Sequence, residues 1–345
     1  MIERREITKQ GRTQVAYELK GISMMDYMEL FIKFGYSYGA QESYKLDHIA
    51  NVVLGEKKLS YEEHGTLYTL YKNDFQKFID YNIKDVELVD RLEDKMGLIT
   101  LAMTIAYKGG VNYQDTFGTT AIWDTIIYRK LHENKIVVPF SEDKTKSNYP
   151  GGYVKEPLVG IHDNVVSFDL NSLYPSIIMQ YNMSPETIAD GEVTNVDIEA
   201  VLTKSQKLNN NNKALAANGQ YFNIDKVGIV PMIIDEMYNE RVGIKQEMIS
   251  AQRELQNVDK EDKQKLYQIE RQISLSENKQ MAIKILLNSL YGAMGNKYFR
   301  FFDQRIAEAI TLTGQLTIRW AEYAINTCLL YTSPSPRDRT RSRMP

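Results

Sequence analysis

Hydrophobic positions recur every three or four residues in several stretches of the chain, which is the spacing of helices with one apolar face. Shorter stretches of this kind lie at residues 21–34, 74–97 and 121–134. Two longer ones follow at 235–256 and 260–292, and the second has a predicted break between Ser274 and Asn278. Because only the charged turn NVDKED separates the two, we expect an antiparallel helical hairpin.

Strand signals are fewer than helix signals. VVSFDL at 165–170 is typical of a short buried strand, and KIVVPF at 135–140 has a strand-like composition. A Pro-Gly-Gly turn signal lies between them, and NNNNKALAANGQ at 209–220 predicts a loop. The length of 345 residues allows two or three domains. The sequence therefore predicts an α+β, multidomain protein.

The last fifteen residues, YTSPSPRDRTRSRMP, differ from the rest of the chain. They show neither a helical nor a strand period and predict a disordered tail. We interpret these residues as foreign to the natural protein. A basic arm that binds nucleic acid is the alternative.

Composition excludes several classes of protein. Hydrophobic residues at 43% and charged residues at 25% are typical of globular chains. The net charge of −3 gives no overall basic signal, so nucleic-acid binding would need a local basic surface. The single cysteine, Cys328, excludes an internal disulfide framework and a multi-cysteine zinc site. The sequence shows no secretory signal, and no apolar run reaches the ~20 residues of a membrane span. We expect a cytoplasmic protein with no membrane partner.

The stretch FDLNSLYPSII places a carboxylate, Asp169, at the end of the predicted strand. Backbone amides are free at strand ends and the side chain there is held by the sheet, so divalent metals and phosphates bind at such positions. An Asp that only caps the following helix fits the same spacing.

In KILLNSLYG, Lys284, Asn288 and Tyr291 fall on one face of a helix. A cation, an amide and an aromatic ring suit a phosphate, a polar base edge or sugar, and a stacked base. A solvated helix face with a buried tyrosine is the alternative.

Arg241 and Lys245 also share a helix face, four residues apart. A hairpin would bring them toward Lys284, so that three cations could converge on one triphosphate. Neighbouring Glu240 and Glu247 could instead neutralise them locally. Tyr81 and Asp85 in YNIKD are a weaker pair, which could orient a water beside a metal or could simply lie on the surface.

Taken together, these segments resemble family B DNA polymerases, and in particular the replicative enzymes of tailed bacteriophages. DLNSLYPSII resembles motif A (DxxSLYPSI), and KILLNSLYGAMG resembles motif B (KxxxNSxYG). PGGYV at 150–154 is similar to the family's Tyr-x-Gly-Gly-type element, and YNIKD to its third exonuclease motif. The motifs occur in the family's order, and the similarity extends over about residues 21–326.

The resemblance implies a division into domains. It assigns a C-terminal remnant of a 3′–5′ exonuclease domain (1–98), a bridging segment of the N-terminal domain (99–141), a first palm segment (142–227), fingers (228–296), a second palm segment (297–328) and a non-homologous tail (329–345). The implied fold is a partial palm sheet with helical-hairpin fingers.

The resemblance also implies roles for single residues. Asp169 and the Leu170 carbonyl would bind Mg²⁺, of which the complete enzyme would hold two ions. Triphosphate binding is implied for the amides of Ser172, Leu173 and Tyr174, and for Arg241, Lys245, Lys284 and Asn288. The Tyr174 ring would exclude a ribose 2′-hydroxyl. Gly151 and Gly152 would contact the template backbone, and Tyr291 and Gly292 would border the nascent base pair. Proofreading would use Tyr81 and Asp85.

The implied activity is template-directed DNA synthesis in replication, with primer–template DNA and deoxynucleoside triphosphates as partners. A sliding clamp, where the parent protein uses one, would bind its missing C-terminus. The family's Tyr-x-Asp-Thr-Asp-Ser hairpin, its first two exonuclease motifs and its thumb are absent from the sequence. The chain therefore resembles an internal piece of a polymerase. Two alternatives stay open: a non-catalytic fragment that binds nucleotide or DNA, and a natural truncated regulator with a basic tail.

Overall fold

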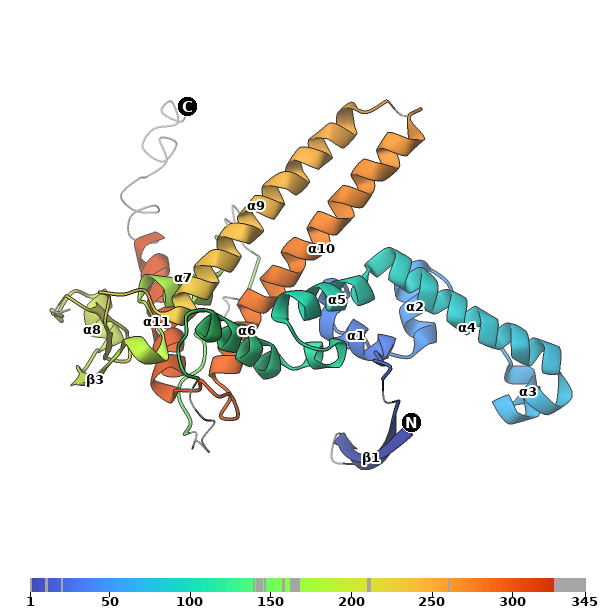
Figure 1. Ribbon diagram of the computed structural model, residues 1–345, viewed down its shortest axis with the longest axis horizontal. Coiled ribbons are helices and arrows are strands. Elements are labelled where there is room, and N and C mark those ends of the chain that lie inside the picture. The colour runs from blue at the N-terminus through green and yellow to red at the C-terminus, as the bar shows by residue number, and fades with distance from the viewer. Residues whose placement is uncertain are drawn as a thin grey trace. The chain divides into compact units, whose positions relative to one another are not determined.

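The computed structural model describes residues 2–9, 12–19, 21–138, 140, 145, 147–156, 159–161, 168–209, 212–259 and 261–325. The chain divides into two compact units (Figure 1). Unit 1 comprises Met1–Gly118 and Ile244–Ala282, and unit 2 comprises Thr119–Gly243 and Ile283–Pro345. The boundary between the units falls after Gly243 and after Ala282, within two long helices described below. Each unit has its own core.

Unit 1 begins with a hairpin that the hydrophobic pattern does not predict. Strands β1 (Ile2–Lys9) and β2 (Arg12–Leu19) pair antiparallel, with Ile2 opposite Leu19. Side chains that accept hydrogen bonds from first-turn amides begin three of the following helices: Asp26, Thr66 and Asp74. The helices are α1 (Tyr27–Phe34), α2 (Leu46–Leu54), α3 (Leu67–Asn73), α4 (Phe75–Met96) and α5 (Leu98–Gly109), with 3₁₀ turns at Tyr36–Tyr38, Glu62–His64 and Tyr113–Phe117.

Unit 2 combines helices with a small sheet. Strands β3 (Ile188–Val193), β4 (Ala214–Leu215) and β5 (Gln220–Phe222) form an antiparallel sheet in the order β3-β5-β4. The shorter helices are α6 (Thr119–Glu133), α7 (Leu173–Gln180), α8 (Ile198–Leu202) and α11 (Gln304–Ala324), with a 3₁₀ turn at Pro185–Thr187. Helices together with an antiparallel sheet agree with the predicted α+β class.

Two long helices, α9 (Ile229–Asn257) and α10 (Lys263–Met294), confirm the two predicted long helical segments. Figure 1 shows them as two long rods joined by a short turn. Near that turn, Lys265 Nζ lies 3.5 Å from Glu254 Oε1. The predicted break between Ser274 and Asn278 is wrong, because α10 runs through it without interruption. Ser274, Leu275 and Glu277 are exposed, but Ser276 is buried on the same helix face as Ile269 and Gln280. Packing along this one face therefore continues through the stretch.

Helix α9 begins at Ile229, six residues before the predicted start, because side chains cap it. Glu186 Oε1 accepts a hydrogen bond from the Ile229 amide at 2.6 Å, and Ser184 Oγ accepts one from the Val230 amide at 3.3 Å. These acceptors come from a distant segment, so the hydrophobic period of the helix does not reveal them.

Three loop and strand predictions need correction. Residues 168–170 and 136–138 are described and are not in strands, while 165–167 lie outside the described residues. The segment predicted as a loop contains β4 and the first residue of β5. An Asn218-Gly219 turn joins these strands, and Gly219 has φ = +87°, which glycine adopts without strain. The predicted tail at 329–345 also lies outside the described residues.

Each core is apolar. Leu30, Leu70, Leu88 and Ile105 are buried in unit 1, and Trp123, Phe222, Ile234 and Phe299 in unit 2. Over the part of the chain that the structure describes, none of the helices has the length and apolar character needed to cross a bilayer.

Candidate active site

Asp169 lies just before helix α7, on an exposed stretch of backbone. Ser172, the residue that precedes the helix, has the left-handed φ of 50°. The amides at a helix N-terminus have no partner within the helix and are available to an anion. Within the described residues, Asp169 makes no hydrogen bond and no ion pair. The carboxylate and the first amides of α7 are therefore both available for ligands.

Tyr174, in the first turn of α7, brings motif A into contact with motif B. Its ring centroid lies 4.9 Å from that of Tyr291 in α10, with an interplanar angle of 48°. Burial raises the pKa of Tyr174. This contact joins segments far apart in the sequence, so the two motifs lie side by side.

Glycines allow other segments to approach the Tyr174 ring closely. A Cβ atom placed on Gly314 of α11 would lie 2.9 Å from Tyr174 Cε1, closer than real Cβ contacts. A Cβ atom on Gly152 would lie 3.3 Å from the Tyr174 hydroxyl oxygen. The position of the ring is therefore bounded by two backbone segments as well as by Tyr291.

A further tyrosine, Tyr149, forms a side-chain hydrogen bond with Tyr291. Burial and then a hydrogen bond with Tyr149 raise the pKa of Tyr291 well above its ordinary value. A Cβ atom on Gly295 would lie 2.9 Å from the Tyr149 hydroxyl oxygen. The sequence prediction assigned no role to Tyr149 and missed Gly314. The position of Tyr149 directly before Pro-Gly-Gly was the one available signal.

Helix α11 holds the Gly-Gly segment. Gln315 Nε2 donates a hydrogen bond of 2.6 Å to the Gly151 carbonyl, and the Arg319 guanidinium lies 5.6 Å from the centre of the Tyr153 ring. Gly151 is exposed. The hydrogen bond thus holds the Gly151 backbone in place, while the residue stays accessible to solvent.

The predicted cations lie on α9 and α10, but the structure gives no direct link between them and Asp169. Lys284 and Asn288 are exposed on α10, and Tyr291 follows them on the same face. Arg241 is half-buried, and its Nε has no hydrogen-bond partner among the described residues. Lys245 is exposed, in the part of α9 that belongs to unit 1. Convergence of these cations on one triphosphate stays a prediction.

The candidate proofreading pair, Tyr81 and Asp85, lies on α4 in unit 1, and Lys58 joins its two members. Lys58 Nζ lies 2.6 Å from Asp85 Oδ2 and 4.8 Å from the centre of the Tyr81 ring. Burial opposes the charge on Lys58, but hydrogen bonds to Asp85 and Tyr81 outweigh it and raise the pKa of Lys58. Asp85 Oδ1 is buried without a partner among the described residues. The sequence prediction missed Lys58.

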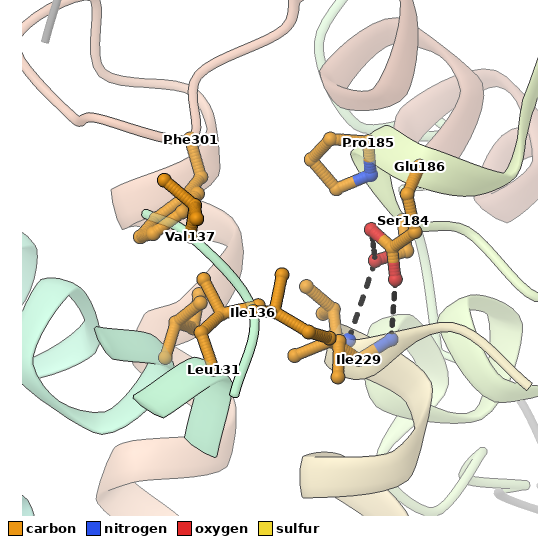
Figure 2. Close-up of a pocket in the computed structure, with 10 residues that line it drawn as sticks. Leu131, Ile136, Val137, Ser184, Pro185, Glu186, Ile229 and Phe301 are labelled. Carbon is orange, nitrogen blue, oxygen red and sulfur yellow. Dashed lines mark hydrogen bonds between the residues drawn. The ribbon is translucent and has the colours of Figure 1, made fainter. Parts of the chain in front are cut away.

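An apolar cavity of about 310 Å³ lies at the start of α9 and is not suited to a triphosphate (Figure 2). Aliphatic side chains and Phe301 form most of its wall. Its polar members, Ser184 and Glu186, are hydrogen-bonded to each other at 2.7 Å and to the amides of α9. The cavity therefore offers no free charge. Over the described residues, no three acidic, histidine or cysteine side chains cluster as a metal site.

Comparison with known proteins places the chain in a family. The model of DNA polymerase family B matches residues 118–339, and the chain belongs to that family. It is 35% identical to the DNA-directed DNA polymerase of Escherichia phage RB69 over 89% of the chain, and 30% identical to that of Enterobacteria phage T4 over 90%. A DNA polymerase of Thermococcus gorgonarius is 30% identical over 59% of the chain.

The likeness to phage polymerases confirms the resemblance that motifs A and B predict. The chain spans 37% of the RB69 protein and 38% of the T4 protein. The comparisons therefore assign this chain to a family, and the activity and partners of the whole protein are a proposal.

Proposed function

We propose that the complete protein containing this chain is a DNA-directed DNA polymerase, a nucleotidyltransferase that extends a primer on a DNA template. Family membership supports the reaction class. The observation that carries the proposal is the contact between Tyr174 and Tyr291, because it unites motif A and motif B. In the reaction, the primer 3′-hydroxyl attacks the α-phosphorus of a deoxynucleoside triphosphate, and pyrophosphate leaves.

Protein groups would mainly hold and neutralise the triphosphate. The amides of Ser172, Leu173 and Tyr174 would bind its phosphates at the start of α7. Arg241, Lys245 and Lys284 would supply positive charge, with Asn288 beside them. The buried, unpartnered Arg241 Nε supports this role, since a buried donor without an acceptor is costly unless a ligand supplies one.

The Tyr174 ring would lie under the sugar and exclude ribonucleotides. Tyr291 and Gly292 would border the nascent base pair, and Gly151 and Gly152 would contact the template backbone. The exposed Gly151 is compatible with that contact. Tyr81 and Asp85 would belong to a 3′–5′ proofreading site, with Lys58 between them.

Asp169 and the Leu170 carbonyl would hold Mg²⁺. Both are oxygen donors, which this ion prefers, and the Asp169 carboxylate is exposed without a described partner. When bound, the ion would stabilise negative charge on the reacting oxygens. Asp169 is the one palm carboxylate that the motifs assign to this chain, so we propose that the isolated 345-residue chain does not catalyse incorporation. It would bind nucleotide or DNA at most.

Primer extension with the complete protein tests the proposal. Asp169→Ala is expected to lower incorporation by on the order of 1,000-fold while DNA binding is retained, because a metal ligand contributes several kcal/mol to charge stabilisation. Asp225→Ala, which removes an exposed carboxylate elsewhere in unit 2, is the control. Ordinary turnover of the Asp169 variant would refute the metal role. Incorporation by the isolated chain would refute its proposed inactivity.

A further inference from the structure

Trp123, in α6, is completely buried and is hydrogen-bonded to α10. Its single indole N–H is shared between the Leu286 carbonyl and Ser289 Oγ, each at 3.1 Å. The Ser289 hydroxyl in turn donates to the Leu286 carbonyl at 2.8 Å. All three residues belong to unit 2. An indole N–H that lost these acceptors would be buried and unpaired, which is costly, so the contact fixes the distance between α6 and α10.

The contact lies on the opposite side of α10 from the candidate nucleotide-binding side chains. Successive residues of a helix are about 100° apart around its axis, so Leu286 and Ser289 share one side and Lys284, Asn288 and Tyr291 share the other. The front face is exposed at Lys284 and Asn288, whereas Trp123 covers the back. A hydrogen bond is directional, so one made to this side of a helix limits the rotation of the helix about its own axis. Apolar packing limits that rotation less strictly.

Two further pairs attach α6 to the same region. Asp124 Oδ1 accepts a hydrogen bond of 2.8 Å from Arg300 Nε, just beyond α10. Lys130 Nζ lies 2.6 Å from Glu236 Oε1 on α9. Both pairs are partly exposed, so solvent screens their attraction, although Arg300 also donates a second hydrogen bond of 3.3 Å from Nη2 to Asp124 Oδ2. The buried Trp123 N–H is therefore the contact most able to set the orientation of α10.

We propose that Trp123 is a positioning residue for nucleotide binding. It holds α10 at the rotation that presents Lys284, Asn288 and Tyr291 to the incoming nucleotide, and Ser289 of motif B is its partner in this role. Trp123 itself does not touch the substrate. This inference rests on the proposed polymerase function.

Steady-state kinetics of the complete polymerase test the inference. Trp123→Phe keeps an aromatic ring but removes the N–H, and it leaves no new buried donor. The KM for the deoxynucleotide is expected to rise about 3- to 10-fold, the effect of one neutral hydrogen bond. The KM for primer–template should not change. A role limited to folding would lower the active fraction, and hence the apparent kcat, without changing the KM for nucleotide.

The chain offers a matched control in its second tryptophan. Trp320, on α11, is 59% exposed, and Trp320→Phe is expected to leave both KM values unchanged. Ser289→Ala removes one of the two acceptors and should raise the KM for nucleotide less than Trp123→Phe does. In the Ser289→Ala background, Trp123→Phe should have a smaller effect than in the wild type, because the two residues share one interaction.

The outcomes separate the inference from the function on which it rests. No incorporation by the wild-type protein would overturn the proposed function, and the inference with it. If both Trp123→Phe and Ser289→Ala kept the wild-type KM for nucleotide, the inference would be overturned and the proposed function would stand. Fully additive effects of the two substitutions would also overturn it. Should Trp123→Phe fail to fold, Ser289→Ala decides by the same KM criterion.

Discussion

Tyr174 is the residue at which most segments of the candidate site meet. Its ring contacts Tyr291 of motif B and lies against Gly314 of α11, and its hydroxyl faces Gly152. The ring is half-buried, and on the sides where backbone approaches it has little room to move, since backbone atoms cannot yield as a flexible side chain can. This rigidity is what a steric filter for a sugar would require.

Replacement of Tyr174 tests the filter. In the complete polymerase, Tyr174→Ala is expected to raise ribonucleotide incorporation relative to deoxynucleotide by at least about 10-fold, because removing the ring opens space for a 2′-hydroxyl. Tyr174→Phe keeps the ring and should retain the wild-type preference. The measurement is the ratio of kcat/KM for the two nucleotides. An unchanged ratio in Tyr174→Ala would mean that the ring lies elsewhere in the working enzyme.

Gly314 tests the close approach from α11. Gly314→Ala places a Cβ atom 2.9 Å from Tyr174 Cε1 and should lower the free energy of unfolding by about 1–3 kcal/mol through overpacking. Gly243→Ala is the control, since it lies in helix α9 with no atom within 4 Å of its Cβ position. That control should be neutral or stabilising by up to about 1 kcal/mol. Urea unfolding measures both, and equal stability of the two variants would contradict the close contact.

At the scale of elements, helix α9 depends on a cap that comes from another segment. Glu186 and Ser184 accept hydrogen bonds from the first amides of α9, as Figure 2 shows at the rim of the apolar cavity. A carboxylate at this end also interacts favourably with the helix dipole. The cap therefore defines where the helix that carries Arg241 begins.

Removing this cap should destabilise the protein. Glu186→Ala is expected to lower the free energy of unfolding by about 1 kcal/mol, because the Ile229 amide and the Ser184 hydroxyl lose their acceptor. Glu247→Ala, an exposed position on the same helix, should change it little. Urea unfolding followed by circular dichroism compares the two. The capping role would be wrong if both variants unfolded at the same urea concentration as the wild type.

At the scale of the whole molecule, both units contain tyrosines whose pKa is raised, with burial as the main cause. They are Tyr27 and Tyr36 in unit 1, and Tyr174, Tyr181 and Tyr291 in unit 2. A raised pKa means that the folded state favours the neutral phenol. Unfolded phenols ionise near their ordinary pKa of 10.0, so ionisation stabilises only the unfolded chain above that pH.

Stability should therefore be constant with respect to these groups below about pH 10 and should fall as the pH rises above it. Urea midpoints measured between about pH 8 and pH 11 test the sign. Absorbance of phenolate should show one group of tyrosines that ionises reversibly and another that ionises only as the protein unfolds. Ionisation of all tyrosines in the folded protein near their ordinary pKa would contradict the burial.

Sequence reasoning succeeded where the signal is local. The two long helices, the α+β class and the motifs of family B were all evident from spacing and residue type. It failed where a distant contact overrides local preference. The Ser274–Asn278 stretch stays helical where Ser276 continues a buried face of α10, and α9 begins early because Glu186 caps it.

The candidate site divides in the same way. Asp169, Tyr174, Lys284 and Tyr291 were identifiable because motifs A and B are contiguous in the sequence. Tyr149, Gly314 and Lys58 carry no such pattern, and their places became clear only from contacts with Tyr291, Tyr174 and Asp85.

By itself, the sequence determined the two long helices and which family the chain resembles, because hydrophobic period and motif spacing act between near neighbours. The tertiary structure alone decided that Tyr174 meets Tyr291 and that Trp123 holds α10 through Leu286 and Ser289. These contacts join residues far apart in the chain. Their side-chain directions depend on how whole elements pack, and no local pattern specifies that.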